Sequence, residues 1–327
     1  MIIVTGGAGF IGSNIVAALT DQGRDVVIVD RLGHDEKWRN IAKHPVRDIV
    51  KPEAVFGLLA REGRHVEAIL HMGAISSTTE RDVDLILENN LRLSIDLWEW
   101  CAIHQVRLIY ASSAATYGDG TQGFEDEATG KALARLRPLN PYGWSKHVFD
   151  RRVIGDIEAG RPRPPQWAGL KFFNVYGPNE YHKGTMKSVV AHMYPDIIAA
   201  GRVSLFKSHH PDYEDGGQLR DFVYVADTVD ITLWLLDRPE ISGLFNVGTG
   251  KARSFADLAR ATFAALQAPP EIHYRDMPEE LKARYQYFTQ ACMDRLRAQG
   301  YAKPFTMLEA GVTDYVRTYL DTEDPYR

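Results

Sequence analysis

The first thirty residues restrict the fold more than any other part of the chain. Met1–Thr5 is a short apolar run suited to a buried strand, and apolar side chains then recur at helical spacing from Ile11 to Leu19. Asp25–Asp30 is a second apolar run that ends in a carboxylate. The order strand, glycine-rich turn, helix, strand predicts the first unit of a parallel α/β sheet.

The turn between the first strand and the helix predicts a dinucleotide site. It carries glycines at positions 6, 7, 9 and 12. Glycines let backbone amides approach a pyrophosphate, and the helix N-terminus adds partial positive charge. Asp30 lies where a carboxylate can accept hydrogen bonds from a ribose. A turn that only packs a helix on a strand needs one glycine, so the set Gly6, Gly9 and Gly12 favours cofactor binding.

The rest of the first half alternates between expected strands and helices. This alternation predicts a Rossmann-type, doubly wound parallel sheet with right-handed crossovers. The expected strands are 68–71, 106–111 and 169–173, and the expected helices are 52–61, 82–101 and 141–158. Residues 120–139 are polar and are expected to form a surface loop.

The pattern changes after Asn174, where glycine, proline and histidine become frequent. We expect a smaller α/β lobe, 175–327, that covers the carboxyl ends of the strands in a cofactor domain, 1–174. Ligands of open α/β sheets bind at that edge. A strand at 244–247 is expected to return to the first domain. The other expected elements are helices at 187–200, 226–236 and 255–266, strands at 203–206 and 221–225, a short strand beyond 271 and a final helix.

Composition excludes several classes. The 327 residues carry a net charge of −5, which argues against non-specific nucleic-acid binding. Cys101 and Cys292 are the only cysteines, so neither a disulfide framework nor a zinc-site spacing is present, and no metal site is expected. No apolar run is long enough to cross a bilayer, and the chain enters its first strand without a signal peptide. These absences favour a cytoplasmic location.

Three polar residues suggest acid–base chemistry. Tyr142 and Lys146 are four apart on an expected helix and share a face. A neighbouring ammonium favours tyrosinate and would lower the tyrosine pKa from its usual value near ~10. Ser113 follows an expected strand and could hydrogen-bond the reacting oxygen. Each signal alone is common, since most Tyr-x-x-x-Lys pairs lie on helix surfaces; together with the glycine turn they become specific.

Two basic residues bear on the choice of cofactor. Arg31 and Lys37 lie close after Asp30, where the adenosine ribose would sit. A 2′-phosphate requires cationic partners, so the pair favours NADP. Asp30 favours a free ribose hydroxyl, and NAD stays possible.

Longer motifs carry a family resemblance. The glycine turn, Ser113, Tyr142 and Lys146 resemble the extended short-chain dehydrogenase/reductase superfamily of nucleotide-sugar epimerases and dehydratases. Within it, the chain resembles the ADP-L-glycero-D-manno-heptose 6-epimerase family almost end to end. The segments that carry this resemblance are 76–80, 110–118, 173–178, 182–184, 220–225, 284–286 and 288–290.

The resemblance implies a reaction. Enzymes of this family oxidise the C6 carbinol of an ADP-heptose to a ketone with NADP⁺, and hydride returns to the other face. This chemistry supplies heptose for the lipopolysaccharide inner core. Two substrate orientations require acid–base groups on two sides, and by resemblance Tyr142 serves one and Lys183 the other. Without the resemblance, Lys183 would be read as a phosphate-binding or solvated lysine. Homo-oligomers, pentamers by resemblance, are also implied.

The resemblance also assigns positions residue by residue. Cofactor contacts are implied for Phe10, Ile11, Asp30, Arg31, Lys37, Lys51, Met72, Gly73, Ala74, Ile75, Ser76, Asn90, Tyr142, Lys146, Val175 and Lys183. Substrate contacts are implied for Ser113, Asn174, Thr185, His192, Leu205, Phe206, Lys207, Ser208, Arg220 and Tyr285. Arg220 is the natural diphosphate partner, because guanidinium forks onto phosphate oxygens.

The chain departs from the family pattern at several points. Arg31 stands where asparagine is more usual, and His71-Met72 replaces a His-Glu pair. Residues 120–139, 155–167 and 209–218 differ in length or content. Two other interpretations stay open. A nucleotide-sugar 4-epimerase or 4,6-dehydratase would share Ser113, Tyr142 and Lys146 without needing Lys183. A non-catalytic NADP-binding sensor would commonly lack the tyrosine or the lysine.

Overall fold

A seven-stranded parallel sheet forms the centre of the molecule. The computed structural model describes residues 1–34, 36–282 and 285–327. The strand order is β11-β6-β5-β4-β1-β2-β3, and every neighbouring pair is parallel. The strands are β1 (Ile2–Thr5), β2 (Val26–Val29), β3 (Asp48–Val50), β4 (Ala68–His71), β5 (Arg107–Ser113), β6 (Trp167–Phe172) and β11 (Gly243–Val247). The predicted Rossmann-type sheet is confirmed.

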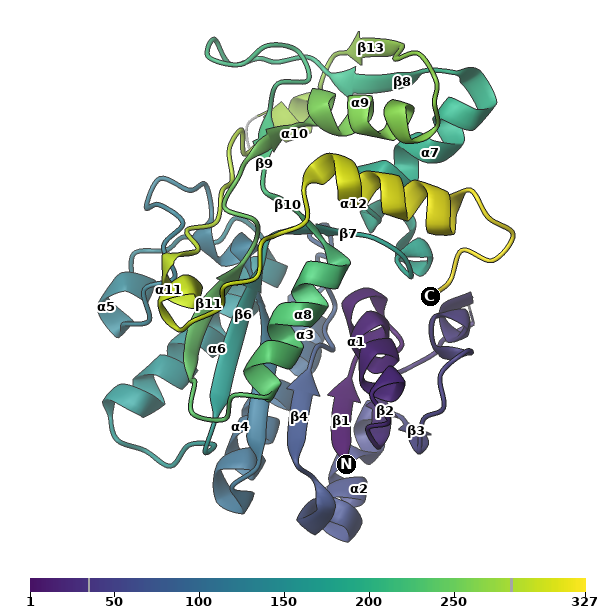
Figure 1. The fold of residues 1–327 in the computed structure, drawn as a ribbon. Coiled ribbons are helices and arrows are strands. Elements are labelled where there is room, and N and C mark those ends of the chain that lie inside the picture. Colours follow the sequence, from purple (N-terminus) through teal and green to yellow (C-terminus); the bar gives the residue numbers. More distant parts are fainter. Residues whose placement is uncertain (35, 283–284) are drawn as a thin grey trace.

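Helices cover both faces of this sheet (Figure 1). α1 (Phe10–Asp21) and α8 (Val225–Leu236) lie on one face, and α4 (Leu93–His104) and α6 (Pro141–Glu158) lie on the other. β1 and β2 are buried along their whole length, as expected for apolar strands between two helical layers. The sheet is therefore buried between the helical layers except at the edge strand β3, where Asp48 and Ile49 are exposed.

The second half of the chain sits mainly beyond the carboxyl ends of the strands (Figure 1). It contains three two-stranded sheets: β7 (Asn174–Tyr176) with β10 (Phe222–Tyr224), β8 (Val203–Phe206) with β13 (Ile272–Arg275), and β9 (Leu219–Arg220) with β12 (Arg253–Ser254). Besides α8, its helices are α7 (Val189–Ala200), α9 (Phe255–Ala265), α10 (Glu279–Lys282), α11 (Asp294–Ala298) and α12 (Leu308–Asp314). β11 leaves this half and pairs with β6 of the central sheet.

The segment 120–139, expected to form a surface loop, is exposed at many positions but is more than a loop. The segment contains a short helix, α5 (Gly130–Leu133), and it buries Phe124 and Leu136. Asp126 accepts a hydrogen bond from the backbone amide of Asn246 at 2.8 Å, and the carbonyl of Phe124 accepts one from the Asn246 side chain. These contacts fasten the segment to β11, while polar residues such as Thr121, Glu127 and Lys131 stay exposed.

Other elements differ from expectation in detail. The helix expected at 82–101 is continuous helical structure, but it divides into α3 (Val83–Ile86), a π-helical turn η4 (Leu87–Arg92) and α4. The final helix likewise continues from α12 into a π-helical turn, η7 (Tyr315–Leu320). The helix expected at 52–61 is η2 (Pro52–Ala54) and α2 (Val55–Glu62). Across the described residues, no helix combines the length and apolar character needed to cross a membrane.

Candidate active site

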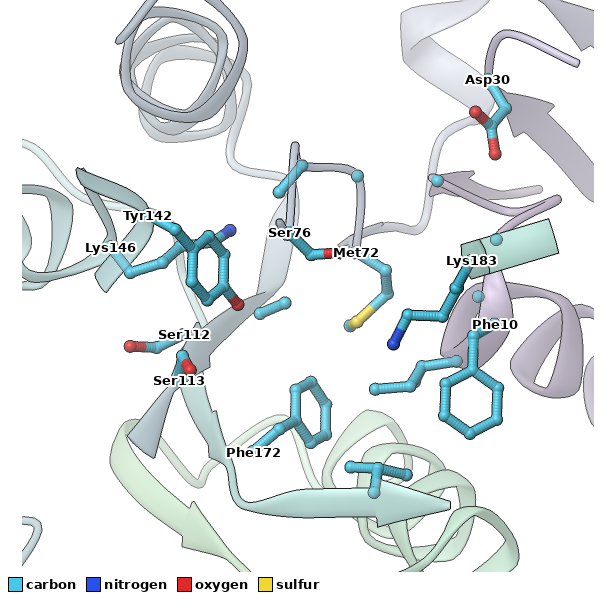
Figure 2. A pocket seen from close by; sticks show the side chains of 18 of the residues that line it. Phe10, Asp30, Met72, Ser76, Ser112, Ser113, Tyr142, Lys146, Phe172 and Lys183 are labelled. Carbon is cyan, nitrogen blue, oxygen red and sulfur yellow. The ribbon is translucent and has the colours of Figure 1, made fainter. Parts of the chain in front are cut away.

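A cavity of about 290 Å³ lies at the carboxyl ends of the sheet strands. Its walls are the glycine turn, the segment after β4, the end of β5, the start of α6, and the 3₁₀ segment η6 (Tyr181–Met186). Figure 2 shows Tyr142 and Lys146 on one side of this cavity and Lys183 on the other, with Met72 between them. The cavity therefore joins residues that are far apart in sequence.

The glycine turn is packed so closely against the chain's own backbone that only glycines fit at two positions. Gly6 has a φ of +65°, and a Cβ there would lie 2.6 Å from the Cα of Gly73. A Cβ on Gly12 would lie 2.1 Å from the carbonyl oxygen of Gly6. Gly9 precedes α1, and no side chain caps this helix. Free amides at a helix N-terminus suit a phosphate, so the turn fits the pyrophosphate of a dinucleotide.

Asp30 organises the adjacent part of the wall. Its carboxylate accepts hydrogen bonds from the backbone amides of Ala8 at 2.9 Å and Arg31 at 2.7 Å, and it pairs with the ammonium of Lys37 at 2.6 Å. Lys37 thus lies on the cavity wall beside the carboxylate. Arg31 is exposed and pairs with Glu53. Both basic residues are held near the end of β2, where a ribose would lie.

Local structure places Tyr142 and Lys146 on adjacent turns of α6. Asn140 caps the helix by accepting a hydrogen bond from the amide of Gly143 at 2.8 Å, and Pro141 occupies the first turn. Burial raises the pKa of Tyr142, and hydrogen bonding with Ser113 opposes that rise. The predicted lowering by Lys146 is therefore not the dominant effect. Burial instead lowers the pKa of Lys146 to about 8.

A buried polar cluster beneath Lys146 was not predicted from the sequence. Asp150, one turn further along α6, pairs with Lys171 at 2.7 Å and accepts hydrogen bonds from Ser112 at 2.7 Å and Tyr110 at 3.1 Å. The negative charge of Asp150 opposes the lowering of the Lys146 pKa. Tyr110 and Ser112 lie within a motif, but nothing in the spacing indicated a shared carboxylate.

A second buried network supports the segment after β4. The ring of His71 bonds to Thr5 Oγ1 at 2.6 Å and to Ser94 Oγ at 2.8 Å. Ser94 Oγ donates to the carbonyl of Asn90, whose side chain accepts from the amide of Ile75 at 2.8 Å. Burial lowers the pKa of His71 to about 3, so the ring is neutral. Asn90 is fully buried and does not line the cavity; it holds the wall from behind.

Lys183 lies in η6, opposite Tyr142 (Figure 2). Its ammonium is 5.3 Å from the centre of the Phe10 ring. Burial lowers the pKa of Lys183, and the charge of Glu180 opposes this effect. The neighbouring His182 also lines the cavity; its Nδ1 lies 3.2 Å from the side-chain nitrogen of Asn40, and burial lowers its pKa to about 4.

Arg220 lies in the second half of the chain and is only 9% exposed. Its guanidinium lies 5.6 Å from the centre of the Phe255 ring and 5.3 Å from that of Tyr285. Within the described part of the chain, no carboxylate forms an ion pair with it. Burial lowers the pKa of Arg220. Tyr287, packed against Tyr285, and Tyr213, packed against Tyr287, extend this aromatic group, which sequence reasoning missed.

The main cavity brings together most of the residues expected to bind cofactor. Those on its wall are Gly6, Gly9, Phe10, Ile11, Gly12, Asp30, Lys37, Met72, Gly73, Ala74, Ser76, Tyr142, Lys146, Val175 and Lys183, together with Ser113. Arg31 and Ile75 line an adjoining hollow of about 200 Å³, which shares Gly6 and Asp30 with the first. Lys51 is exposed and lines neither.

The residues expected to contact substrate are more dispersed. Asn174 is exposed in β7, and the ring of His192 lies 3.3 Å from the carbonyl of Thr185. Leu205 packs into the core beneath β8, whereas Phe206 stacks with Arg275. Lys207 pairs with Asp276, and Ser208 bonds to the loop that follows it. Arg284, part of one quoted motif, lies outside the described residues.

Known proteins resemble this chain over most or all of its length. Residues 2–248 match the model of the NAD dependent epimerase/dehydratase family. A curated ADP-L-glycero-D-manno-heptose-6-epimerase from Nitratidesulfovibrio vulgaris (strain DP4) is 51% identical over 330 residues, covering 100% of both chains.

Solved structures are similar over nearly the same length. The Helicobacter pylori ADP-L-glycero-D-manno-heptose-6-epimerase has a TM-score of 0.78 at 28% identity, over 97% of this chain and 95% of that one. The Thermus thermophilus UDP-glucose 4-epimerase in complex with NAD has a TM-score of 0.73 at 26% identity, over 97% of this chain and 98% of that one.

Proposed function

Because this chain belongs to the NAD dependent epimerase/dehydratase family, we propose that it converts ADP-D-glycero-D-manno-heptose into its C6 epimer, ADP-L-glycero-D-manno-heptose. The observation that carries the proposal is the placement of Tyr142 and Lys183 on opposite sides of one cavity (Figure 2). Inversion requires hydride to leave one face of C6 and return to the other, so the C6 oxygen loses and regains its proton in two orientations. Two separated acid–base groups can serve these orientations. A full-length relative of the same named activity supports the choice of sugar.

Tyr142 acts on one orientation of the substrate. When bound, the nicotinamide cofactor supplies reversible hydride exchange with the sugar carbon. Tyr142 takes the proton of the C6 hydroxyl as the carbon is oxidised, and it returns a proton when the carbon is reduced. Ser113 hydrogen-bonds the reacting oxygen. Lys146, beside Tyr142, contributes positive charge that stabilises the tyrosinate when the proton has left.

Lys183 performs the same transfer for the opposite orientation. A lysine serves as a base only if some of it is neutral near physiological pH, and burial lowers the Lys183 pKa in that direction. Phe10 limits solvent on one side of the ammonium. In one turnover Tyr142 gains the proton that the C6 hydroxyl loses, and Lys183 gives the proton that the new hydroxyl gains. Exchange of one proton with solvent at each residue then restores both protonation states.

The diphosphate of the substrate is assigned to Arg220. A largely buried guanidinium with no carboxylate partner among the described residues is suited to a phosphate. Tyr285, whose ring lies against Arg220, belongs to the same site. The remaining proposed substrate contacts are Asn174, Thr185, His192, Leu205, Phe206, Lys207 and Ser208.

The nicotinamide cofactor follows from the family, and its finer identity is part of the proposal. Arg31 and Lys37, both held near Asp30, favour NADP over NAD. We also propose that the chain divides into a cofactor domain, 1–174 with the returning strand at 244–247, and a substrate lobe, 175–327. We further propose that the protein assembles into a homo-oligomer and that its product supplies heptose for lipopolysaccharide.

The decisive experiment is conversion of ADP-D-glycero-β-D-manno-heptose with chromatographic separation of the two C6 epimers. Wild type should interconvert them, and Tyr142→Phe and Lys183→Met should each lose most activity. A wild-type enzyme that leaves the heptose unchanged and inverts C4 of a UDP- or dTDP-hexose would overturn the heptose assignment. Tight NADP binding without turnover of any nucleotide sugar would favour a sensor instead.

A further inference from the structure

Glu180 is a buried carboxylate that the proposed mechanism does not use. It is 0% exposed and lies three residues before Lys183. Its oxygens accept hydrogen bonds from the backbone amide of Ser188, from Ser188 Oγ at 2.6 Å, from the Tyr315 hydroxyl at 3.0 Å and from the amide of Gly177 at 3.4 Å. One side chain therefore holds three separate parts of the chain.

These contacts close a loop around Lys183. Gly177 and Ser188 are the two ends of the segment that contains η6, and Glu180 bonds to both. Ser188 also caps α7, since its side chain accepts from the amide of Ala191. Tyr315 belongs to η7, so the carboxylate joins the segment to the C-terminal helix as well. Lys183 lies near the middle of this closed loop, at the cavity.

No ion pair accounts for the buried charge. Among the residues that the structure describes, no basic side chain lies within ion-pair distance of Glu180, whereas the buried Asp150 pairs directly with Lys171. An unpaired buried carboxylate is costly unless hydrogen bonds and a nearby cation stabilise it. Burial raises the pKa of Glu180, and the hydrogen bonds from Ser188 and Tyr315 together with the charge of Lys183 oppose that rise.

Few other titratable groups surround Glu180 and Lys183 among the described residues. The phenols of Tyr315 and Tyr181 face the carboxylate, from η7 and from η6. His182 lies beside Lys183. Burial and the charge of Lys37 lower the pKa of His182, and the charge of Asp30 raises it. Burial lowers the pKa of Lys183, and the charge of Glu180 raises it. Removal of the Glu180 charge should therefore act mainly on Lys183.

We infer that Glu180 is the positioning residue for Lys183: its hydrogen bonds close the segment 177–188 and so fix the place of Lys183 on the cavity wall. The inference rests on the proposed function only for the role of Lys183 as an acid–base group. The coupling of the two side chains can be measured without any substrate.

The test compares Glu180→Gln with wild type by trace acetylation. The pH dependence of acetylation at Lys183 is followed by peptide mass spectrometry, with the exposed Lys251 as internal reference. Glu180→Gln should shift the midpoint for Lys183 to lower pH, because the opposing negative charge is lost, and should lower kcat by about 10–100-fold through misplacement. Glu240→Gln, a surface carboxylate-to-amide change, is the matched control and should alter neither quantity.

Ser188→Ala keeps the carboxylate and removes one tether. It should leave the acetylation midpoint near that of wild type and still lower kcat, which separates charge from position. If Glu180→Gln does not fold, Ser188→Ala combined with Tyr315→Phe replaces it and should raise the acetylation rate of Lys183 at each pH. An unchanged midpoint and unchanged turnover in Glu180→Gln, or an unchanged rate in the double variant, would overturn the inference. A shifted midpoint in a protein that does not epimerise the heptose would support the coupling and reject only the proposed function.

Discussion

The two walls of the cavity are built very differently. Tyr142 and Lys146 lie on α6, an 18-residue helix with a side-chain cap, and Ser113 ends a strand in the middle of the sheet. Lys183 lies on η6, a six-residue segment interrupted by Gly184 at a φ of 56°. One wall is fixed by regular backbone structure and the other by a few side-chain contacts. The same type of chemical group can therefore be placed by two strategies of unequal rigidity.

The largest expected effect compares the two lysines. Lys146→Ala and Lys183→Ala should each lower kcat by about 10²–10⁴-fold, as expected for loss of a group in the proton-transfer machinery. Ethylamine should restore part of the activity of Lys183→Ala, because this lysine lies half-buried on the cavity wall. It should restore less in Lys146→Ala, where the native side chain is only 3% exposed. Equal rescue of both variants, measured by epimer formation, would remove the distinction between the walls.

Two glycine-to-alanine substitutions compare the glycine turn with η6. Gly12→Ala introduces a Cβ 2.1 Å from the backbone oxygen of Gly6, which must distort the turn; overpacking of about 1–3 kcal/mol corresponds to about 10–100-fold weaker cofactor binding. Gly184→Ala meets nothing within 4 Å, and its strain comes only from the positive φ. It should lower the free energy of unfolding by roughly 1–2 kcal/mol and leave cofactor affinity near wild type. Isothermal titration and urea unfolding measure both; weakened cofactor binding in Gly184→Ala would show that the two walls are coupled.

The adenosine-ribose end of the cavity, beside Asp30, is tested through Arg31. Arg31→Ala should weaken NADP binding by about tenfold or more, since a hydrogen bond to a charged group contributes roughly 1.5–3 kcal/mol. Binding of NAD should change little, because NAD lacks the 2′-phosphate that the guanidinium would contact. Arg39→Ala removes a nearby exposed arginine that pairs with Glu36 and serves as control. Equal loss for NADP and NAD would mean that Arg31 supports the loop rather than selecting the cofactor.

The parts of the molecule built from regular helices and strands were also the more predictable ones. The apolar runs at β1, β2 and β4, the glycine turn and the extent of α6 follow from local periodicity and capping, which sequence displays directly. β11 was recognised as a returning strand because it is a buried apolar run. β3 and β7 have three residues each, too few to show a period.

The less predictable features depend on long-range contacts. The burial of Phe124 and Asp126 could not be predicted because their partner, Asn246, is more than a hundred positions away. The pKa of Tyr142 was expected to fall beside Lys146, yet burial, which local sequence does not reveal, raises it. Lys183 was recognised only through family resemblance, since a lysine in a glycine-rich turn carries no physical sign of its role. Glu180 was missed because its partners Ser188 and Tyr315 come from two other elements.

The smallest predicted effect uses stability to measure how deeply each lysine is buried. Burial lowers the pKa of Lys146 from 10.5 to about 8, so between these values the unfolded chain binds more protons than the native protein. The free energy of unfolding of wild type therefore increases with pH across this range. From pH 7 to pH 9, wild type should gain about 1 kcal/mol in free energy of unfolding relative to Lys146→Met. Lys183→Met should show a change of the same sign but smaller, because that lysine is only partly buried. Urea titrations at the two pH values measure both; an equal change for the two lysines would show that the wall carrying Lys183 excludes water as completely as the wall built on α6.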